Sequence, residues 1–280
     1  MYKIVSRREL NPTTTMITVE APFVARKAEP GQFVILRPTA DGERIPLTIS
    51  DYDREKGTVS VIFQIVGTTT KKLNAIKEGE YIQDFAGPLG NPTEVEGLKK
   101  VAVVGGGVGC AIAYPIAKKL HQMGAEVYLI VGFRNKDLII LEEEYQAACT
   151  HLTMMTDDGS YGRKGMVTEA LKDILDQKVE LDEVIAIGPP IMMKFVCKLT
   201  KEYGVKTIVS MNPIMIDGTG MCGGCRLTVG GETKFACVDG PDFDGHLVDF
   251  DEMMSRNGSY KEFERHSYEK TCNLMNKEVQ

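Results

Sequence analysis

A chain of 280 residues is longer than one hydrophobic core usually serves, and its 43% apolar and 26% charged residues are ordinary for a globular protein. Its 33 Lys and Arg residues are outnumbered by 39 Asp and Glu residues, which gives a formal charge of -6. Because phosphate binding depends on an excess of cations, this balance argues against nucleic acid as the main partner, and we expect two domains with a small appendage.

Neither the start of the chain nor its most apolar window predicts export or membrane insertion. The opening MYKIVSRREL lacks the apolar run of a secretory signal. Residues 101–117 are the most apolar window, but they fall short of the ~20 residues that span a bilayer and include four glycines and a proline. Seven cysteines without a signal are typical of a reducing compartment, so we expect a cytoplasmic protein with no membrane partner.

Short β-type runs separated by turn residues fill residues 1–98. The runs are KIVSRREL, TMITVEA, GQFVILRP, IPLTISDYD, GTVSVIFQIVG and EGEYIQDFAGPLG. Strands that follow one another so closely favour antiparallel pairing, so we expect a β-barrel domain with one helix over residues 71–76.

From residue 99, compact apolar strands alternate with helix-length segments. The strands are VAVVGG, EVYLIVGF, LTMMTDD, DEVIAIGPP and TIVSMNP, and we expect the helices over residues 111–123, 141–149, 166–177 and 192–203. This alternation predicts a Rossmann-like α/β domain with a doubly wound parallel sheet over residues 99–210.

Residues 211–255 are rich in glycine and cysteine and show little periodicity, and residues 256–280 form a polar tail with a helical pattern. Three cysteines lie within sixteen residues of this segment: Cys222, Cys225 and Cys237. Three thiolates make an incomplete metal site, so a fourth ligand is expected. We interpret the remaining cysteines as packing or surface residues: Cys110, Cys149, Cys197 and Cys272.

A glycine-rich turn joins the first strand of the α/β half to its first helix, at Gly105, Gly106, Gly107 and Gly109. Such a backbone can approach a pyrophosphate, whose charge meets the unpaired N–H groups of the helix N-terminus. The alternative is a tight turn that needs glycine only for close packing. Gly188 and Pro189 follow a later strand on the same expected edge of the sheet, although a turn that opens a helix would also explain them.

Charged residues follow the second and third of these strands. Arg134 and Lys136 could meet the extra phosphate of NADP or could be solvated loop charges, so the choice between NADH and NADPH stays open. Asp157 and Asp158 could reach ribose hydroxyls or the nicotinamide edge, or could be turn formers.

The barrel half carries a second candidate phosphate site. The run RIPLTIS places Arg44, Pro46 and Thr48 around the start of a strand, and IVGTTTKKL places residues 67–70 at the start of a helix. An arginine that faces a Gly-Thr-rich helix start can hold the pyrophosphate of a different nucleotide. A barrel packed on a nucleotide domain would then bring two cofactors face to face.

These motifs, in their order along the chain, resemble the ferredoxin-NADP reductase superfamily over about residues 1–255. The closer resemblance is to the branch that ends in a 2Fe-2S domain. This branch includes the electron-transfer subunits of dihydroorotate dehydrogenase and the small subunits of sulfide dehydrogenase and of NADH-dependent reduced ferredoxin:NADP oxidoreductase. The motifs that carry it are RIPLTIS, IVGTTT, GPLG, VVGGGVG, GFRNKD, TDDGSYG, GPP and the cysteine-rich segment.

The resemblance implies FAD in the barrel domain and NAD(H) on the α/β domain, with NADP(H) as the open alternative. The implied FAD contacts are Arg44, Pro46, Leu47, Thr48, Phe63, Gln64, Ile65, Gly67, Thr69 and Thr70. The implied nicotinamide-nucleotide contacts are Gly105, Gly107, Gly109, Arg134, Asp157, Asp158, Gly188 and Pro189.

The resemblance also implies a 2Fe-2S cluster on residues 211–255. Dihydroorotate-type subunits supply four cysteines, the first five residues before the second, but in this chain that position is Asp217. The small subunit of the ferredoxin:NADP enzyme resembles this chain in having the aspartate. Its reach and negative charge would let Asp217 complete a site with Cys222, Cys225 and Cys237.

Two other interpretations of the cysteines remain. One is a zinc knuckle with Asp217, Asp239 or His246 as the fourth ligand, and the other is a reactive dithiol without metal. The surrounding glycines favour iron and sulfide, because they expose N–H groups that can donate to cluster sulfurs.

The function implied by the resemblance is that of an electron-transfer subunit. NADH gives two electrons as hydride whereas an iron-sulfur cluster takes one at a time, so a flavin must lie between them. The implied partner, in a heterodimer, is a larger subunit with FAD and 4Fe-4S clusters that serves ferredoxin and NADP(H) by electron bifurcation. The alternatives are the electron-transfer subunit of an NAD-linked dihydroorotate dehydrogenase or of a sulfide dehydrogenase and, in another class, a zinc-stapled nucleotide-binding structural or sensor protein. No side chain is assigned as a catalytic acid or base.

Overall fold

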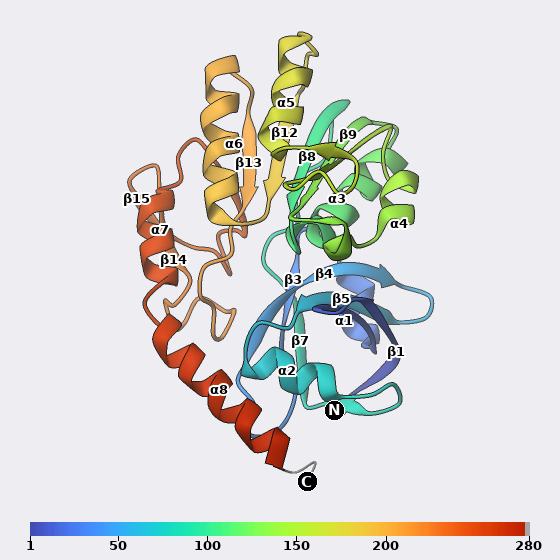
Figure 1. Cartoon of the computed structure of the whole chain (residues 1–280), viewed down its shortest axis with the longest axis vertical. Helices are drawn as coiled ribbons and strands as arrows, with labels where there is room; N and C mark the ends of the chain where they lie inside the picture. Colours follow the sequence, from blue (N-terminus) through green and yellow to red (C-terminus); the bar gives the residue numbers. More distant parts are fainter. Residues whose placement is uncertain (278–280) are drawn as a thin grey trace.

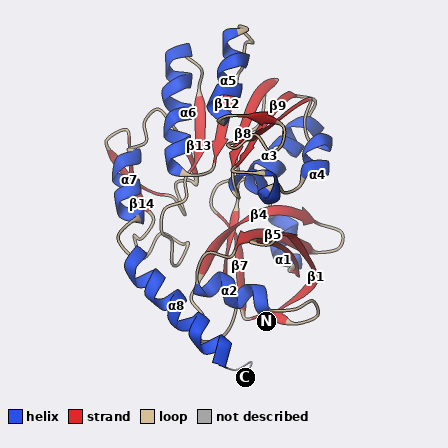
Figure 2. Ribbon diagram, in the orientation of Figure 1, coloured by secondary structure: helices blue, strands red, loops and turns tan. Residues whose placement is uncertain are grey.

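The computed structural model describes residues 1–277, with the side chains of residues 1–269, so the side chain of Cys272 lies outside the described residues. A curled antiparallel sheet and a helix-flanked parallel sheet lie one above the other, and the C-terminal region runs along the side of both (Figure 1). Strands and helices segregate as the sequence predicts, with most strands of the lower half following one another directly (Figure 2).

The first sheet has seven strands in the order β6-β1-β2-β5-β4-β3-β7, and every neighbouring pair is antiparallel. Their bounds are β1 (Tyr2–Asn11), β2 (Thr14–Glu20), β3 (Phe33–Arg37), β4 (Ile45–Asp53), β5 (Thr58–Gln64), β6 (Tyr81–Ile82) and β7 (Asp84–Leu89). One residue, Gln83, joins the two outer strands, so the sheet curls round on itself. The predicted antiparallel barrel is confirmed as this half-barrel.

Two short helices accompany the half-barrel. The helix expected over residues 71–76 is α2 (Thr68–Ala75), which begins directly after Gly67. The other, α1 (Pro22–Lys27), was not predicted, although Pro22 at its first position is a typical helix start. Both cover the barrel core, which includes Ile17, Val59 and Val61.

The second sheet has the order β11-β10-β9-β8-β12-β13-β16. Its strands are β8 (Lys100–Gly106), β9 (Glu126–Phe133), β10 (His151–Thr156), β11 (Arg163–Lys164), β12 (Glu183–Ile187), β13 (Thr207–Ser210) and β16 (Asp242–Asp244). The helices are α3 (Gly109–Gln122), η1 (Lys136–Leu138), α4 (Glu142–Ala147), α5 (Val167–Asp176) and α6 (Pro190–Tyr203). The predicted parallel sheet is confirmed, with two short strands added at its edges: β11 pairs parallel with β10, and β16 pairs antiparallel with β13.

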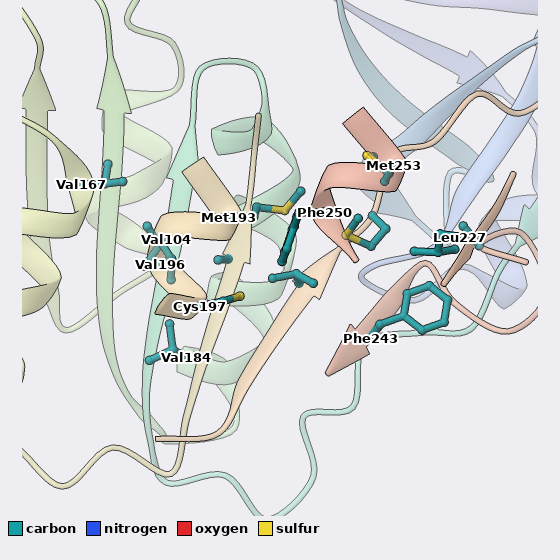
Figure 3. Close-up of a cluster of buried hydrophobic side chains, with 14 of the residues drawn as sticks. Val104, Val167, Val184, Met193, Val196, Cys197, Leu227, Phe243, Phe250 and Met253 are labelled. Atoms are coloured by element: carbon teal, nitrogen blue, oxygen red, sulfur yellow. The ribbon is translucent and has the colours of Figure 1, made fainter. Parts of the chain in front are cut away.

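This sheet is buried on both faces, which is why its strands are continuously apolar. Val101 and Val103 of β8 pack in the core that contains α3, whereas Ala102 and Val104 pack in the core that contains α5 and α6. The second core continues from Val104 into the C-terminal region (Figure 3).

The C-terminal region contains β14 (Arg226–Val229), β15 (Glu232–Phe235), α7 (Phe250–Asn257) and α8 (Lys261–Lys277). The two strands form an antiparallel hairpin that the sequence analysis missed. Its signal was the pair Gly230 and Gly231, which take φ values of +60° and +82°, as a two-residue hairpin turn requires. The region joins the α/β half through β16 and reaches the barrel through α8, where Ser267 Oγ lies 3.3 Å from Thr68 Oγ1 (Figure 1).

None of the helices in the described part of the chain combines the length and the apolar character that crossing a bilayer requires.

Candidate functional site

Four loops that carry expected nucleotide contacts meet at the carboxyl edge of the parallel sheet. Ile187 of β12 lies opposite Gly105 of β8 in the last residue pair between these two strands, so the glycine turn and Gly188 are neighbours. Gly107 N donates to Gly132 O at 2.8 Å, and Asp157 N donates to Phe133 O at 3.0 Å. Ligands of open α/β sheets bind at this edge.

The glycines of this edge have different roles. A Cβ atom at Gly105 would lie 2.8 Å from Cys110 Cα, and one at Gly109 would lie 2.5 Å from Ile187 O. These two glycines allow β8, α3 and β12 to pack closely, in agreement with the alternative that the turn needs glycine for packing. Gly107 differs, because its φ is +57° and a Cβ atom there would meet nothing within 4 Å. Its backbone is open to the approach of a phosphate at the N-terminus of α3.

The side chains beyond β9, β10 and β12 are exposed at the same edge, namely Arg134, Asp157, Asp158 and Pro189. The Asp158 carboxylate accepts hydrogen bonds from Ser160 Oγ at 2.6 Å and Ser160 N at 2.9 Å, and these bonds lower its pKa. Asp158 therefore acts as a turn former, whereas the neighbouring Asp157 is exposed next to the end of β9, where its N–H donates to Phe133 O.

The barrel half brings its expected phosphate contacts together. Thr70 Oγ1 caps α2 by accepting from Val66 N at 3.1 Å and from Gly67 N at 3.0 Å. The first amides of the helix lack acceptors within it, so the N-terminus carries a partial positive charge. Thr69 Oγ1 donates to Glu43 Oε2 at 3.5 Å, which places the loop that carries Arg44 at this helix end.

The other expected FAD contacts lie within or next to the strands of the barrel and not at the start of α2. Phe63 is 1% exposed and belongs to the barrel core, so its side chain faces away from solvent and only its main chain can contact a ligand. Gln64 pairs with Thr14 in the ladder, and Ile65 packs partly against the core. Leu47 lies opposite Val34, between Pro46 and Thr48 on β4.

Two surface cavities lie elsewhere. One, of about 590 Å³, is lined by residues of β1, of α4 and of the segment before α4, and by Tyr161. The other, of about 460 Å³, lies on the outer side of the barrel and is also lined by Lys118 of α3. Of the candidate cofactor contacts, only Lys136, considered for the extra phosphate of NADP, lies among the lining residues, in the first cavity.

The hairpin β14–β15 brings two of the clustered cysteines together. Cys225 precedes β14 and Cys237 follows β15, and Ala236 N donates to Cys225 O at 3.2 Å. Both side chains are buried, whereas Cys222 is exposed. Burial and the adjacent Cys225 thiol raise the pKa of Cys237 to about 12.

Asp217 lies at the base of the loop that carries Cys222. Its carboxylate accepts Thr219 N and Cys222 N, both at 2.7 Å, and these bonds lower its pKa. Cys222 Sγ accepts Gly224 N at 3.4 Å, and a Gly220 amide donor faces Cys237. Backbone donors at sulfur and an anionic side chain beside three thiols match the chemistry of an iron-sulfur site.

Among the described residues, no three His, Cys, Asp or Glu side chains are grouped closely enough to hold a single metal ion. The candidate ligands are therefore gathered on one loop and hairpin, but not arranged around one ion. The fourth-ligand alternatives fit less well than Asp217. Asp239 Oδ2 accepts Phe235 N at 2.6 Å, and His246 Nε2 lies 3.0 Å from Thr200 Oγ1 on α6.

Exposed apolar side chains, which were not expected from the sequence, surround this loop. Met221 is 88% exposed, Ile216 is 56% exposed and Val238 is 43% exposed. The sequence signal that could have indicated them is the presence of apolar residues beside the cysteines in a segment without helical or strand periodicity. The other described cysteines, Cys110, Cys149 and Cys197, are buried, and burial raises the pKa of each thiol, as expected for packing residues.

Two family models match the chain, one over the cysteine segment and one over the α/β half. Residues 212–249 match the iron-sulfur cluster binding domain of dihydroorotate dehydrogenase B, and residues 103–198 match the oxidoreductase NAD-binding domain. The chain is 48% identical over 252 residues to a dihydroorotate dehydrogenase B (NAD(+)) electron transfer subunit homolog of Thermotoga maritima, covering 90% of this chain and 89% of that one. It is 55% identical over 269 residues to an uncharacterized protein of Clostridium beijerinckii, covering 93% and 91%.

A solved structure matches over nearly the whole fold. It is described as giving insights into flavin-based electron bifurcation via the NADH-dependent reduced ferredoxin-NADP oxidoreductase structure. Its chain has 45% sequence identity with this one and a TM-score of 0.91, covering 96% of this chain and 97% of that chain.

Proposed function

We propose that the chain connects NAD(H) to a larger redox partner. The premise is that it belongs to the dihydroorotate dehydrogenase B electron-transfer subunit family and has the ferredoxin-NADP reductase-like fold. In this proposal FAD occupies the barrel half, NAD(H) the α/β half and a 2Fe-2S cluster the cysteine segment. The observation that carries it is the grouping of Asp217 with the three cysteines on one loop and hairpin.

The proposal gives each part of the chain a task. Residues 1–98 hold FAD between the Arg44 loop and the N-terminus of α2, and residues 99–210 bind the nicotinamide nucleotide at the glycine turn. Residues 211–255 hold the cluster. Bound FAD supplies the conversion between hydride and single-electron transfer. The protein groups orient the cofactors and exclude water, and the choice between NADH and NADPH is left to Arg134 and its loop.

A partner is supported by the surface around Cys222. The three exposed apolar side chains, Met221, Ile216 and Val238, lie beside the candidate cluster ligands, and such residues are enriched in the buried cores of protein interfaces. We propose a larger subunit with FAD and 4Fe-4S clusters that serves ferredoxin and NADP(H) by bifurcation. Free thiols at six described cysteines support a reducing, cytoplasmic setting.

Cofactor analysis of the isolated chain tests the proposal. We expect a yellow-brown protein with one flavin and about two iron and two acid-labile sulfide per chain. A colourless protein with zinc would instead establish the zinc-stapled alternative.

The ligand assignment is tested by Asp217→Ala, with Asp239→Ala as the matched control, because both carboxylates accept backbone N–H groups near the cysteines. We expect Asp217→Ala to lose the cluster absorption while FAD stays bound, and Asp239→Ala to keep both. Loss of the cluster in the Asp239 variant alone would contradict the assignment.

A second candidate function is that of the electron-transfer subunit of an NAD-linked dihydroorotate dehydrogenase, which the family match over residues 212–249 favours. A sulfide dehydrogenase subunit is the third member of this group. Copurification of the tagged chain separates these functions, since a dihydroorotate-oxidising partner and a partner with 4Fe-4S clusters differ in visible absorption and in iron content.

A further inference from the structure

Strand β3 of the half-barrel belongs to two cores. Its side chains alternate between the two faces of the sheet, as in any strand. Val34 and Leu36 lie in the barrel core, whereas Phe33 and Ile35 lie in the core that also contains Cys225 and Cys237. The outer face of β3 is therefore covered by the cysteine segment.

The same strand adjoins the expected flavin segment. Ile35 lies opposite Pro46 of β4, and Phe33 lies opposite Thr48. One strand thus separates the segment assigned to FAD from the segment assigned to the cluster.

The cysteine segment packs on β3 at Gly218, which follows Asp217. Gly218 is buried and has a φ of +75°. A Cβ atom there would lie 2.7 Å from Ile35 Cγ1 and 2.9 Å from Leu89 Cδ1. Leu89 can rotate the end of its side chain away, but Ile35 is β-branched and stiff at χ1, so any side chain at position 218 would push the loop off the strand.

A second set of contacts fixes the other end of the segment to the chain that leaves β7. Asn91 N donates to Gly240 O at 2.7 Å, and Asn91 Nδ2 donates to Val238 O at 3.1 Å. Thr93 Oγ1 donates to Asp242 Oδ2 at 2.5 Å. Because the residues after Cys237 are held here, displacement at Gly218 would move the Asp217 end alone.

We propose that Gly218 is a positioning residue for electron transfer between the flavin and the cluster. Its lack of a side chain sets how closely the Asp217 loop lies on β3. This inference rests on the proposed function. Because electron transfer through protein slows steeply with distance, an outward shift of the loop slows the step from flavin to cluster and leaves the hydride step from NADH to flavin unchanged.

Gly218→Ala tests the proposal, with Gly97→Ala as the matched control. Gly97 has a nearly equal φ of +77°, is exposed, and has nothing within 4 Å of the position of a Cβ atom. After rapid mixing of the isolated chain with NADH, we expect flavin bleaching at the wild-type rate in both variants. Cluster reduction should be several-fold slower in Gly218→Ala and unchanged in Gly97→Ala.

A double variant, Gly218→Ala with Ile35→Ala, removes the obstructing Cγ1 atom and should recover much of the lost rate. If Gly218→Ala binds too little iron for its rate to be measured, the iron content tests the inference instead, because the double variant should then contain more iron per chain than the single variant. Hydrogen exchange of the as-isolated chain gives a readout that is independent of electron transfer. We expect faster exchange of the Thr219 and Cys222 amides in Gly218→Ala than in Gly97→Ala.

Equal rates of cluster reduction in wild type and Gly218→Ala would overturn the inference, as would a double variant no better than the single one. These results differ from a failure of the proposed function, in which the wild-type chain itself contains no flavin or no iron.

Discussion

The parallel sheet and the loop from Asp217 to Cys222 are stabilised in different ways. The sheet buries apolar residues on both faces, with Val101 and Val103 on one side and Ala102 and Val104 on the other. The loop from Asp217 to Cys222 is held by hydrogen bonds between side chain and backbone, and it turns at Gly218 and Gly220 with φ values of +75° and +84°.

This difference indicates which part of the molecule depends on a ligand. Burial of apolar area stabilises the sheet whether or not a nucleotide is bound. Apart from the contact of Gly218 with β3, the loop is held by exposed hydrogen bonds, which stabilise it little. The rest of its conformation therefore depends on whatever its thiols and carboxylate bind. Three substitutions test this contrast.

The largest effect is expected in the sheet, from Leu120→Ala on α3. Leu120 is 0% exposed in the core beneath β8, and its truncation should lower the free energy of unfolding by about 2–5 kcal/mol. The loss should be the same with and without cofactors, as urea unfolding followed by circular dichroism would show. Met123→Ala at the end of the same helix, where the side chain is 48% exposed, is the control, with an expected change within about 0.5 kcal/mol. Equal effects of the two substitutions would contradict the contrast.

An intermediate effect is expected at Asp242 on β16, the strand that joins the C-terminal region to the parallel sheet. Burial raises the pKa of this carboxyl to about 6, and its Oδ1 atom has no hydrogen-bond partner among the described residues. Because the folded pKa lies above the unfolded one, the folded state binds the proton more tightly. Stability is therefore lost as the pH rises from about 4 to about 6, up to about 3 kcal/mol.

Asp242→Asn removes this ionisation and keeps an oxygen that can accept from Thr93 Oγ1. The variant should be more stable than wild type at pH 7, and the difference should shrink towards pH 4. Unfolding free energies measured at both pH values check this, and a difference independent of pH would show that the Asp242 carboxyl does not titrate in this range.

The sequence predicted the regions that follow a regular pattern. Helices α3, α5 and α6 were expected from their apolar period, with starts one or two residues from the observed ones. Strand β16 was missed because three residues, DFD, form no pattern and pair only through tertiary contact. The double burial of β3 was indicated by its continuous apolar run FVILR, but the contact between Ile35 and Gly218 joins residues distant in sequence. The spacing to Cys222 and the family resemblance predicted Asp217 as a ligand. Its hydrogen bonds to the Thr219 and Cys222 amides could not be predicted from the sequence, because they depend on how the loop folds.

The smallest effect is expected in the cysteine loop, from Asp217→Asn in the chain without cofactors. The pKa of Asp217 is lowered by the Thr219 and Cys222 amides, so its stabilisation is present above its unfolded pKa and is lost as the pH falls through the lower, folded pKa. Asparagine keeps one acceptor oxygen and loses the charge, and because the site is largely solvated the global loss at pH 7 should be no more than about 1 kcal/mol.

Hydrogen exchange locates this loss better than global unfolding does. The Cys222 amide should exchange faster in Asp217→Asn than in wild type at neutral pH, with the ratio of the rates approaching one in acid, while the amides of β8 stay unchanged. Equal exchange of the Cys222 amide in both proteins at pH 7 would mean that the loop is held without the carboxylate. The cysteine segment would then resemble the sheet, in that its conformation would not depend on what Asp217 binds.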